Sequence, residues 1–425
     1  MLHTTSPITT HRHYLDVRLL FTTRIVRLFF YGFLSIALAL YLAQAGMSEE
    51  QIGLLLSLIL VGDAGRSLWL TTTADRFGRR RSLRIGALLM ILAGVVFAMT
   101  RQPILLMIVG IVGIISPSGN EIGPFLSIEQ AALSQLLPNE RRTQVYAWYN
   151  LVGSFATAAG ALCGGLLANT LQHNGMSALD SYRVIVVGYA TGGVVLTVLF
   201  SLLSPAVEWS PNLQQAEVQR ILGLHRSRGV VARLSALFAL DSFAGGFVVQ
   251  SIIAYWFHLR FGVDIGVLGG LFFGANLLAG ISALLSTRIA QSIGLINTMV
   301  FTHIPSNILL CVVPLMPNFP LAAAVLLLRF SISQMDVPTR QSYTMAVVAP
   351  DERSAASGIT TIARSAGSAL APALSGLVLA SPVGYPFFVA GGLKIIYDLL
   401  LYSSFRSRPP PEEVVSSSIS SSSRP

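Results

Sequence analysis

Long apolar runs separated by short polar loops repeat along the chain between residues 26 and 404. A helix needs about 20 residues, at about 1.5 Å each, to cross roughly 30 Å of hydrocarbon. The pattern predicts twelve such helices, at 26–45, 51–73, 83–100, 104–131, 144–168, 184–204, 236–257, 266–287, 295–316, 320–346, 357–380 and 385–404. The sequence therefore predicts an all-α membrane protein.

The two halves of the chain carry related sequences. GMSEEQIG at residues 46–53 corresponds to GVDIGVLG at residues 262–269, an offset of 262 − 46 = 216. PNER and PDER, which begin at Pro138 and Pro350, repeat at a similar offset of 350 − 138 = 212. Duplicated halves related by an axis along the membrane normal are typical of transporters, which bind their substrate where the halves meet.

A polar stretch separates six predicted helices from the other six, so we expect two pseudo-symmetric six-helix bundles. The predicted parts are a cytoplasmic N-terminal segment (1–23), an N-terminal bundle (24–205), a cytoplasmic linker (206–233), a C-terminal bundle (234–405) and a disordered Ser/Pro-rich cytoplasmic tail (406–425).

Composition supports a membrane protein. The chain is 53% hydrophobic and only 11% charged, whereas soluble domains carry about 25% charged residues. The net charge of +9 comes almost wholly from arginines in the loops. By the positive-inside rule these loops and both termini are cytoplasmic, which indicates a multi-pass protein, expected in the cell membrane, rather than a nucleic-acid-binding one.

Several kinds of chemistry lack their sequence signals. Cys163 and Cys311 lie in apolar runs, and the seven histidines show no metal-ligand spacing. No phosphate-binding loop, nucleophile elbow or zinc-protease motif is present. We therefore expect no metal, no cofactor and no enzymatic activity.

Ionisable residues inside predicted spans are functional candidates, because each costs about 2.5–3.5 kcal/mol at a helix centre. Asp63 and Arg66 are three residues apart and share a helix face, as an internal ion pair or as a proton relay. Glu121 in the fourth span is a candidate for proton coupling or substrate binding, or alternatively the partner of an arginine. Glu129, on the same face, is expected near the inner membrane interface.

The tenth span carries one polar stripe of Arg329, Ser333, Asp336 and Arg340. Pro338 breaks the hydrogen-bond ladder of this span, as Pro124 does in the fourth span. Arg329, and Arg364 in the eleventh span, are candidates for binding an anionic group of a substrate or for pairing with an internal carboxylate.

Other charged residues near the span ends suggest structural roles. Asp241 is expected at the membrane interface. Lys394 and Asp398 are four residues apart in the twelfth span and are expected to neutralise each other.

The loop after the second span reads TTTADRFGRRRSL, which resembles the signature G-x-L-A-D-R-x-G-R-R of the major facilitator superfamily. Thr71 and Thr73 replace the glycine and leucine of that signature. The matching residues are Ala74, Asp75, Arg76, Gly78, Arg79 and Arg80. The resemblance implies a major facilitator fold in which the residues from Asp75 to Arg80 close the cytoplasmic side.

A second, weaker resemblance lies in the fifth span. GALCGG at residues 160–165 is similar to the G-P-x-x-G-G element of exporters, with alanine in place of the proline. Small residues at this spacing also allow close helix packing. Both interpretations stay open from the sequence.

These observations favour a secondary transporter that moves a small organic solute by alternating access, with proton-coupled export as the preferred mode. An uptake carrier for an organic anion, using Arg66, Arg329 and Arg364, is one alternative. A transporter-like receptor that binds without translocating is another. The expected partners are the solute, protons and membrane lipids, and the protein is expected to be monomeric.

Overall fold

The computed structural model describes residues 7–121, 125–137, 139–208, 226–349, 352–379 and 383–406. Side chains are described for these residues except 7–13, 71, 72, 75, 76, 139–144, 147 and 354. Pro124, most of the expected linker and almost all of the expected tail lie outside this part of the chain.

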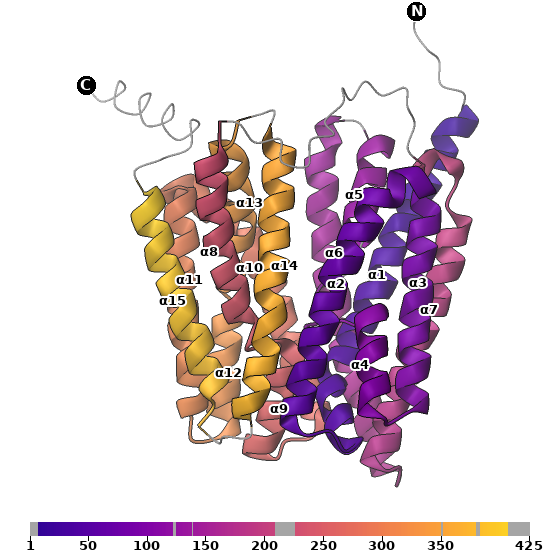
Figure 1. Ribbon diagram of the computed structural model, residues 1–425, viewed down its shortest axis with the longest axis vertical. Coiled ribbons are helices and arrows are strands. Elements are labelled where there is room, and N and C mark those ends of the chain that lie inside the picture. Colours follow the sequence, from indigo (N-terminus) through magenta and orange to yellow (C-terminus); the bar gives the residue numbers. More distant parts are fainter. Residues whose placement is uncertain are drawn as a thin grey trace, which may run out of the picture. The chain divides into compact units, whose positions relative to one another are not determined.

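The chain divides into two compact units. Unit 1 comprises Met1–Gln214 with Gln250–Phe273, and unit 2 comprises Gln215–Val249 with Gly274–Pro425. The described residues of both units form helices and turns without a strand (Figure 1). Residues 250–273 therefore group with the first half, although the sequence places them after the expected linker.

Unit 1 contains the elements of the predicted N-terminal bundle and a short helix from beyond it. Its helices are α1 (Pro7–Gln44), α2 (Glu49–Phe77), α3 (Arg79–Met99), α4 (Pro103–Val112), α5 (Phe125–Leu136), α6 (Asn139–His173), α7 (Ala178–Leu202), η1 (Pro205–Val207), α9 (Gln250–Phe261) and the first part of α10 (Ile265–Ile293).

Unit 2 repeats much of this order. Its helices are α8 (Arg228–Gly246), the rest of α10, α11 (Leu295–Val312), η2 (Val313–Leu315), α12 (Phe319–Phe330), α13 (Asp336–Val347), α14 (Arg353–Leu379) and α15 (Tyr385–Phe405).

Three of the predicted spans are interrupted. The span predicted at 104–131 consists of α4 and α5, the one at 236–257 of α8 and α9, and the one at 320–346 of α12 and α13. The breaks after α4 and α12 fall at equivalent places, because α12 begins 319 − 103 = 216 residues after α4. The sequence predicted a broken hydrogen-bond ladder at Pro124 and Pro338 only, whereas α4 and α12 end earlier, at Val112 and Phe330. The end of α8 at Gly246 was not predicted.

The interruptions have local causes. Gly119, between α4 and α5, adopts φ +69°, a conformation that residues with a Cβ rarely adopt. The Ser116 hydroxyl donates to the carbonyl of Asn120 at 2.7 Å and stabilises the same turn. In the second half, Pro338 lies in the first turn of α13, where a missing amide proton leaves no helical bond unmade.

Glycines allow α6 to pack closely on α1. Gly160 and Gly164 lie directly against the backbones of Phe29 and Phe33, so that a Cβ at either position would overlap a carbonyl group of α1. The GALCGG element therefore serves close helix packing within unit 1.

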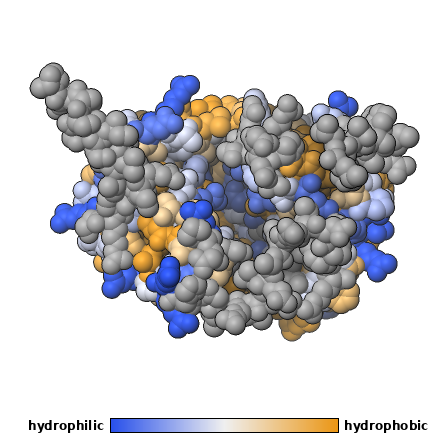
Figure 2. Space-filling view, turned by 90° about the horizontal axis from the view of Figure 1, so that it is seen from above, coloured by the Kyte–Doolittle hydropathy of each residue, from blue (hydrophilic) through white to orange (hydrophobic). Residues whose placement is uncertain are grey.

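Apolar side chains also cover much of the surface. Trp69, Met99 and Ile104 are exposed by 56%, 82% and 74%, and orange apolar side chains reach the surface in Figure 2. Ten helical stretches of the described chain are long and apolar enough to cross a membrane, and α4 and α12 are shorter apolar helices. Such a surface suits lipid better than water.

The first helix is longer than the sequence suggested. The predicted span began at residue 26, whereas α1 begins at Pro7 and its apolar stretch at Tyr14. Asp16, Thr23 and Arg24 in the added turns are buried with hydrogen-bond partners. Asp16, for example, accepts hydrogen bonds from the amide (2.9 Å) and hydroxyl (2.5 Å) of Ser204.

Candidate functional site

A buried ion network lies inside unit 1 and is centred on Arg27 of α1. The Arg27 side chain is fully buried. Its guanidinium donates to Glu121 from Nε (2.8 Å) and Nη2 (3.2 Å) and to Glu129 from Nη1 (2.8 Å) and Nη2 (2.7 Å). One cation therefore holds both carboxylates, and Arg27 also lies over the Phe125 ring at 4.6 Å.

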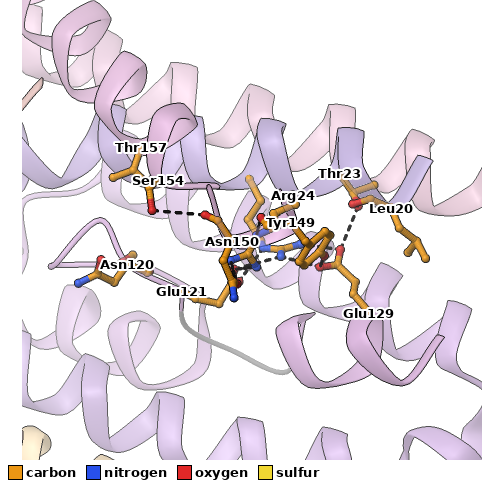
Figure 3. Close-up of polar contacts among 12 residues, drawn as sticks. Leu20, Thr23, Arg24, Asn120, Glu121, Glu129, Tyr149, Asn150, Ser154 and Thr157 are labelled. Carbon is orange, nitrogen blue, oxygen red and sulfur yellow. Dashed lines mark hydrogen bonds and ion pairs between the residues drawn. The ribbon is translucent and has the colours of Figure 1, made fainter. Parts of the chain in front are cut away.

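Arg24, one turn earlier on α1, completes the pairing. It donates to Glu121 at 2.9 Å, to the carbonyl of Tyr149 at 2.7 Å and to the Asn150 side chain at 3.1 Å. Figure 3 shows Arg24 and Glu121 converging with Tyr149 and Asn150 of α6. The carboxylate of Glu121 thus has an arginine partner, as one of the two interpretations of the sequence proposed.

The second carboxylate, Glu129 of α5, is satisfied from several sides. The hydroxyls of Thr23 (2.9 Å) and Tyr149 donate to it in addition to Arg27. Glu129 is fully buried, although the sequence suggested a position near the membrane interface. The charges of two arginines and two glutamates cancel in this network, and hydrogen bonds join the four side chains.

Arg24 and Arg27 were not among the predicted site residues, because both lie before or at the start of the apolar run at 26–45. A usable signal was present. The fourth span carries two carboxylates and no cation, so their partners had to come from another helix.

Asp63 and Arg66 of α2 lie together as their spacing predicts. Arg66 Nη2 is 4.0 Å from Asp63 Oδ1. The Arg66 guanidinium also donates to the carbonyl of Ile111 at the end of α4, and Ser67 donates to Asp63 at 3.4 Å. The pair thus links α2 to α4 within unit 1.

The signature loop is anchored to the end of the sixth span. Gly78 has φ +95° and separates α2 from α3. The carboxylate of Glu208 accepts hydrogen bonds from the backbone amides of Arg79 (2.6 Å) and Arg80 (3.3 Å), the first two residues of α3. The positive end of the helix dipole at the start of α3 favours such an anion. The Arg79 side chain is buried and donates to Gln135 of α5 at 3.0 Å.

Arg80 reaches the carbonyl of Ser201 at 3.4 Å. The side chains of Asp75 and Arg76 lie outside the described part of the chain, so the gate expected of these residues stays a prediction.

Unit 2 contains a second buried network, centred on Asp241 of α8. Arg340 donates to Asp241 at 3.1 Å and to Asp336, one turn earlier on α13, at 3.0 Å. Lys394 of α15 donates to the other oxygen of Asp241 at 2.5 Å. Asp241 is buried between two cations, so the interpretation of this residue as interfacial was wrong.

Asp398 has a different partner from the one expected. Its carboxylate oxygens face His303 Nδ1 at 2.8 Å and the amide nitrogen of Asn307 at 3.0 Å, both on α11. Lys394 pairs with Asp241 instead. The predicted neutralisation of Lys394 by Asp398 was therefore wrong, because side chains from α8 and α11 compete for both groups.

Arg329 and Arg364 have no ion pair with any described carboxylate. The Arg364 Nε donates to the hydroxyl of Ser242 at 3.1 Å. The Arg329 guanidinium lies over the Phe330 ring at 5.0 Å, and its Nε is buried without a hydrogen-bond partner in the described chain. Both guanidiniums lie within the electrostatic field of Asp241 and Asp336.

The predicted stripe of the tenth span is divided between elements. Arg329 lies in the last turn of α12, Ser333 lies in the turn that follows, and Asp336 and Arg340 lie in α13. The stripe is therefore not one continuous helical face. Arg340 forms ion pairs with Asp241 and Asp336, whereas Arg329 forms none with a described carboxylate.

The two units differ in how their buried cations are paired. The unit 1 network balances Arg24 and Arg27 against Glu121 and Glu129. The described part of unit 2 contains four buried or half-buried cations (Arg329, Arg340, Arg364 and Lys394) and four buried carboxylates (Asp241, Asp336, Glu352 and Asp398). Arg329 and Arg364 form no ion pair with a described carboxylate, which makes their guanidiniums able to hold an anion.

The related positions also carry opposite charges. Asp241 of α8 lies 241 − 27 = 214 residues after Arg27 of α1, within the range of the repeat offsets. In unit 1 the first helix supplies the cations, whereas in unit 2 the equivalent helix supplies the carboxylate. No group of side chains suited to holding a metal ion is present in the described part of either unit.

Comparison with known proteins gives the family. The model of the Major Facilitator Superfamily matches residues 20–372. The chain is 31% identical over 420 residues to the Saccharomyces cerevisiae protein "Uncharacterized membrane protein YJR124C", covering 92% of this chain and 94% of that protein.

Solved structures show a similar fold at low identity. The nucleoside transporter NupG (D323A mutant) matches with a TM-score of 0.73 at 12% identity, covering 92% of this chain and 100% of that one. A D-xylose-proton symporter matches with 0.71 at 16%, covering 92% and 97%. The human organic anion transporter MFSD10 (TETRAN) matches with 0.63 at 16%, covering 92% and 99%.

These matches confirm the predicted all-α fold of twelve transmembrane helices and the family suggested by the signature loop. They indicate a secondary transporter of small molecules rather than an enzyme. The chain is a multi-pass membrane protein that belongs to the Major Facilitator Superfamily.

Proposed function

We propose that this protein is a secondary transporter of a small organic anion, whose negative group binds Arg329 and Arg364. The observation that carries the proposal is that both guanidiniums lie in unit 2 without an ion pair to a described carboxylate. Every other buried cation in the two networks has at least one such partner.

A buried cation without an ion-pair partner is costly inside a membrane-spanning segment. A cation inside a membrane-spanning segment costs about 2.5–3.5 kcal/mol on insertion scales, and a carboxylate or sulfonate that binds a guanidinium offsets that cost with charge-assisted hydrogen bonds. Arg329 and Arg364 thus gain most from an anion supplied from outside the chain.

A solved neighbour agrees with this class of substrate. The human protein whose fold resembles this chain is described as an organic anion transporter. At 16% identity it supports the fold alone, so the arginines of this chain carry the proposal.

The proposal selects one of the possibilities that the sequence left open. Organic anion transport replaces export of an unspecified solute as the preferred function, and Arg66, which pairs with Asp63, is less available for a substrate than Arg329 or Arg364. We propose in addition that the loop from Asp75 to Arg80 closes the cytoplasmic side during the transport cycle, with Glu208 holding its second half in place.

Ligand-dependent stability tests the proposal. The purified protein is heated in detergent with benzenesulfonate, succinate, tetraethylammonium or glucose, each over a range of concentrations. A ligand that binds only the folded state adds about 2.7 kcal/mol at a hundred times its Kd. We expect stabilisation by an anion, reduced by Arg329→Gln and by Arg364→Gln.

Arg183→Gln is the matched control, because Arg183 forms an exposed ion pair with Asp180. Equal loss in all three variants, or stabilisation by the cation alone, would contradict an anion site. Solute counterflow in proteoliposomes with the stabilising anion then separates a carrier from a receptor, since only a carrier exchanges the solute across the bilayer.

A further inference from the structure

We infer that the start of α3 binds the headgroup of an anionic phospholipid through Arg80, Arg81 and Arg84. The acyl chains of this lipid lie along the apolar face of α3 that begins at Arg81. The site lies on the surface of unit 1, so it is separate from the proposed anion site in unit 2 and does not depend on it.

One face of α3 is suited to contact with lipid along its whole length. Its exposed side chains follow one another at intervals of three and four residues, which places them on a single helix face. They are Arg81, Ile85, Leu88, Leu92, Val95 and Met99.

The length of this face places Arg81 at the level of the lipid headgroups. From Arg81 to Met99 the helix rises by about 27 Å, at about 1.5 Å for each of 99 − 81 = 18 residues. The hydrocarbon layer of a membrane is roughly 30 Å thick. When the apolar part of the face lies in that layer, the guanidiniums of Arg81 and Arg84 reach the phosphates of one leaflet.

The end of α7 extends the apolar surface beside the arginines. Helices α3 and α7 pack against each other in unit 1 (Figure 1). Arg80 Nη2 donates to the carbonyl of Ser201 at 3.4 Å, which brings the last turn of α7 to the start of α3. Val198 and Leu202 of α7 are exposed by 55% and 63%. An acyl chain next to the arginines therefore has apolar side chains of two helices to contact.

The three arginines keep hydrogen-bond donors for an anion from outside the chain. The ion pairs in the described part of unit 1 use other arginines, namely Arg24, Arg27, Arg66 and Arg183. Arg80 Nε is buried without a hydrogen-bond partner in the described chain. Arg84 Nε donates to the carbonyl of Arg80 at 3.2 Å, so its contact is with the backbone of its own helix and leaves its charge unpaired.

Side chains rather than the helix end would bind the phosphate. The first two amides of α3, those of Arg79 and Arg80, already donate to the carboxylate of Glu208. The Arg79 side chain is buried and donates to Gln135. The site therefore consists of the guanidiniums that point away from these contacts, those of Arg81 and Arg84, together with Arg80.

The fold does not require arginines at these positions. Helix α11 begins 295 − 79 = 216 residues after α3, at the repeat offset, and is its counterpart in unit 2. The three arginines correspond there to Ile296, Asn297 and Val300. The family signature ends at Arg80, so Arg81 and Arg84 lie beyond it. The basic group is thus particular to one helix of unit 1.

The charge of the group selects the kind of lipid. A guanidinium binds a phosphate with two parallel hydrogen bonds, and each arginine at an anionic membrane surface strengthens binding about fivefold. Phosphatidylcholine carries a quaternary ammonium beside its phosphate, which offsets this attraction. We therefore expect phosphatidylserine to bind more tightly than phosphatidylcholine with the same acyl chains.

Native mass spectrometry of the full-length protein in a neutral detergent measures both affinities. Dioleoyl phosphatidylserine and dioleoyl phosphatidylcholine are titrated separately, and the Kd of the first bound lipid is compared. In Arg81→Gln/Arg84→Gln we expect the Kd of phosphatidylserine to rise by about 25-fold and that of phosphatidylcholine to stay the same. Equal affinity of the two lipids in the wild type, or an unchanged Kd in the double variant, would overturn the inference.

Two further variants separate the site from general effects of charge and folding. Arg288→Gln removes an exposed arginine near the end of α10 in unit 2 and should leave the affinity for phosphatidylserine unchanged. Arg81→Lys/Arg84→Lys keeps both charges and should retain most of the affinity. A loss as large as in the glutamine variant would show that the substitutions disturb the start of α3, and would contradict recognition by charge.

Two measurements test whether the ligand is a lipid and where it lies. Glycerophosphoserine, the headgroup without acyl chains, should not displace phosphatidylserine at equal concentration; full displacement would assign the site to a free phosphate anion instead. Phosphatidylserine with a diazirine in its acyl chain should label peptides of α3 and α7 on irradiation, and less so in Arg81→Gln/Arg84→Gln. Labelling that the double variant leaves unchanged would refute the placement.

Discussion

Replacing Arg27 by methionine removes the cation that joins two buried carboxylates. Arg27 makes four hydrogen bonds at 2.7–3.2 Å to Glu121 and Glu129 and is fully buried. Breaking a buried ion pair from one side costs about 3–5 kcal/mol, because the remaining charge stays out of water. Methionine occupies a similar volume, so little of the loss should come from a cavity.

The contacts that the two carboxylates keep limit the loss of stability in Arg27→Met. Glu121 keeps its ion pair with Arg24 at 2.9 Å, and Glu129 keeps the hydroxyls of Thr23 and Tyr149. Because Glu129 loses its only arginine, adding Glu129→Gln to Arg27→Met should recover part of the loss. We expect the single variant to fall by about 3–5 kcal/mol and the double variant to fall by less.

Equilibrium unfolding in mixed detergent micelles with increasing sodium dodecyl sulfate measures these differences. Arg183→Met is the control, because its ion pair with Asp180 is exposed by 33% and 52% and surface pairs contribute about 0.2–1 kcal/mol. An Arg27→Met variant no less stable than Arg183→Met would refute the account of the unit 1 network.

Three further changes test other parts of the structure by the same unfolding assay. Tyr149→Phe removes a hydroxyl that donates to Glu129 and should cost about 1.5–3 kcal/mol, as hydrogen bonds to charged groups do; no loss would show that the carboxylate finds water instead. Glu208→Gln weakens the acceptor at the start of α3 and should cost about 0.5–2 kcal/mol, as loss of a cap does, whereas unchanged stability would remove that role. Gly160→Leu should destabilise by more than about 1–3 kcal/mol, because its Cβ meets the backbone of α1, while Gly270→Leu, with open space at that position, should not.

The sequence was sufficient for the class of fold. Spans were recognisable because a helix needs about 20 consecutive apolar residues to cross a membrane. The low share of charged residues also excluded a soluble domain. The signature from Ala74 to Arg80 then pointed to the correct family. These features depend on local composition and spacing, which a single sequence records directly.

The broken spans could not be predicted in the same way. Residues 113–121 (GIISPSGNE) and 331–335 (SISQM) contain polar and turn-forming residues, but counting apolar runs joined them to the spans on either side. The repeat was the available clue, because the offset that relates Gly46 to Gly262 also relates the starts of α4 and α12.

Pairing of charges was the least predictable feature. Spacing along one helix suggested Lys394 with Asp398, but each found a partner on another helix. Spacing did succeed for Asp63 with Arg66. Asp336 and Arg340 were expected only to share a polar stripe, and they form an ion pair at 3.0 Å. The tertiary packing decides which charges are buried and which of them meet.

The position of a bound anion tests the central claim most directly. Crystals of the protein grown with 4-bromobenzenesulfonate would locate the ligand by the anomalous signal of bromine, independently of any transport assay. The account predicts the sulfonate within hydrogen-bond distance of Arg329 and Arg364 in unit 2. A sulfonate bound elsewhere, or one that keeps its place in the Arg329→Gln/Arg364→Gln double variant, would contradict it.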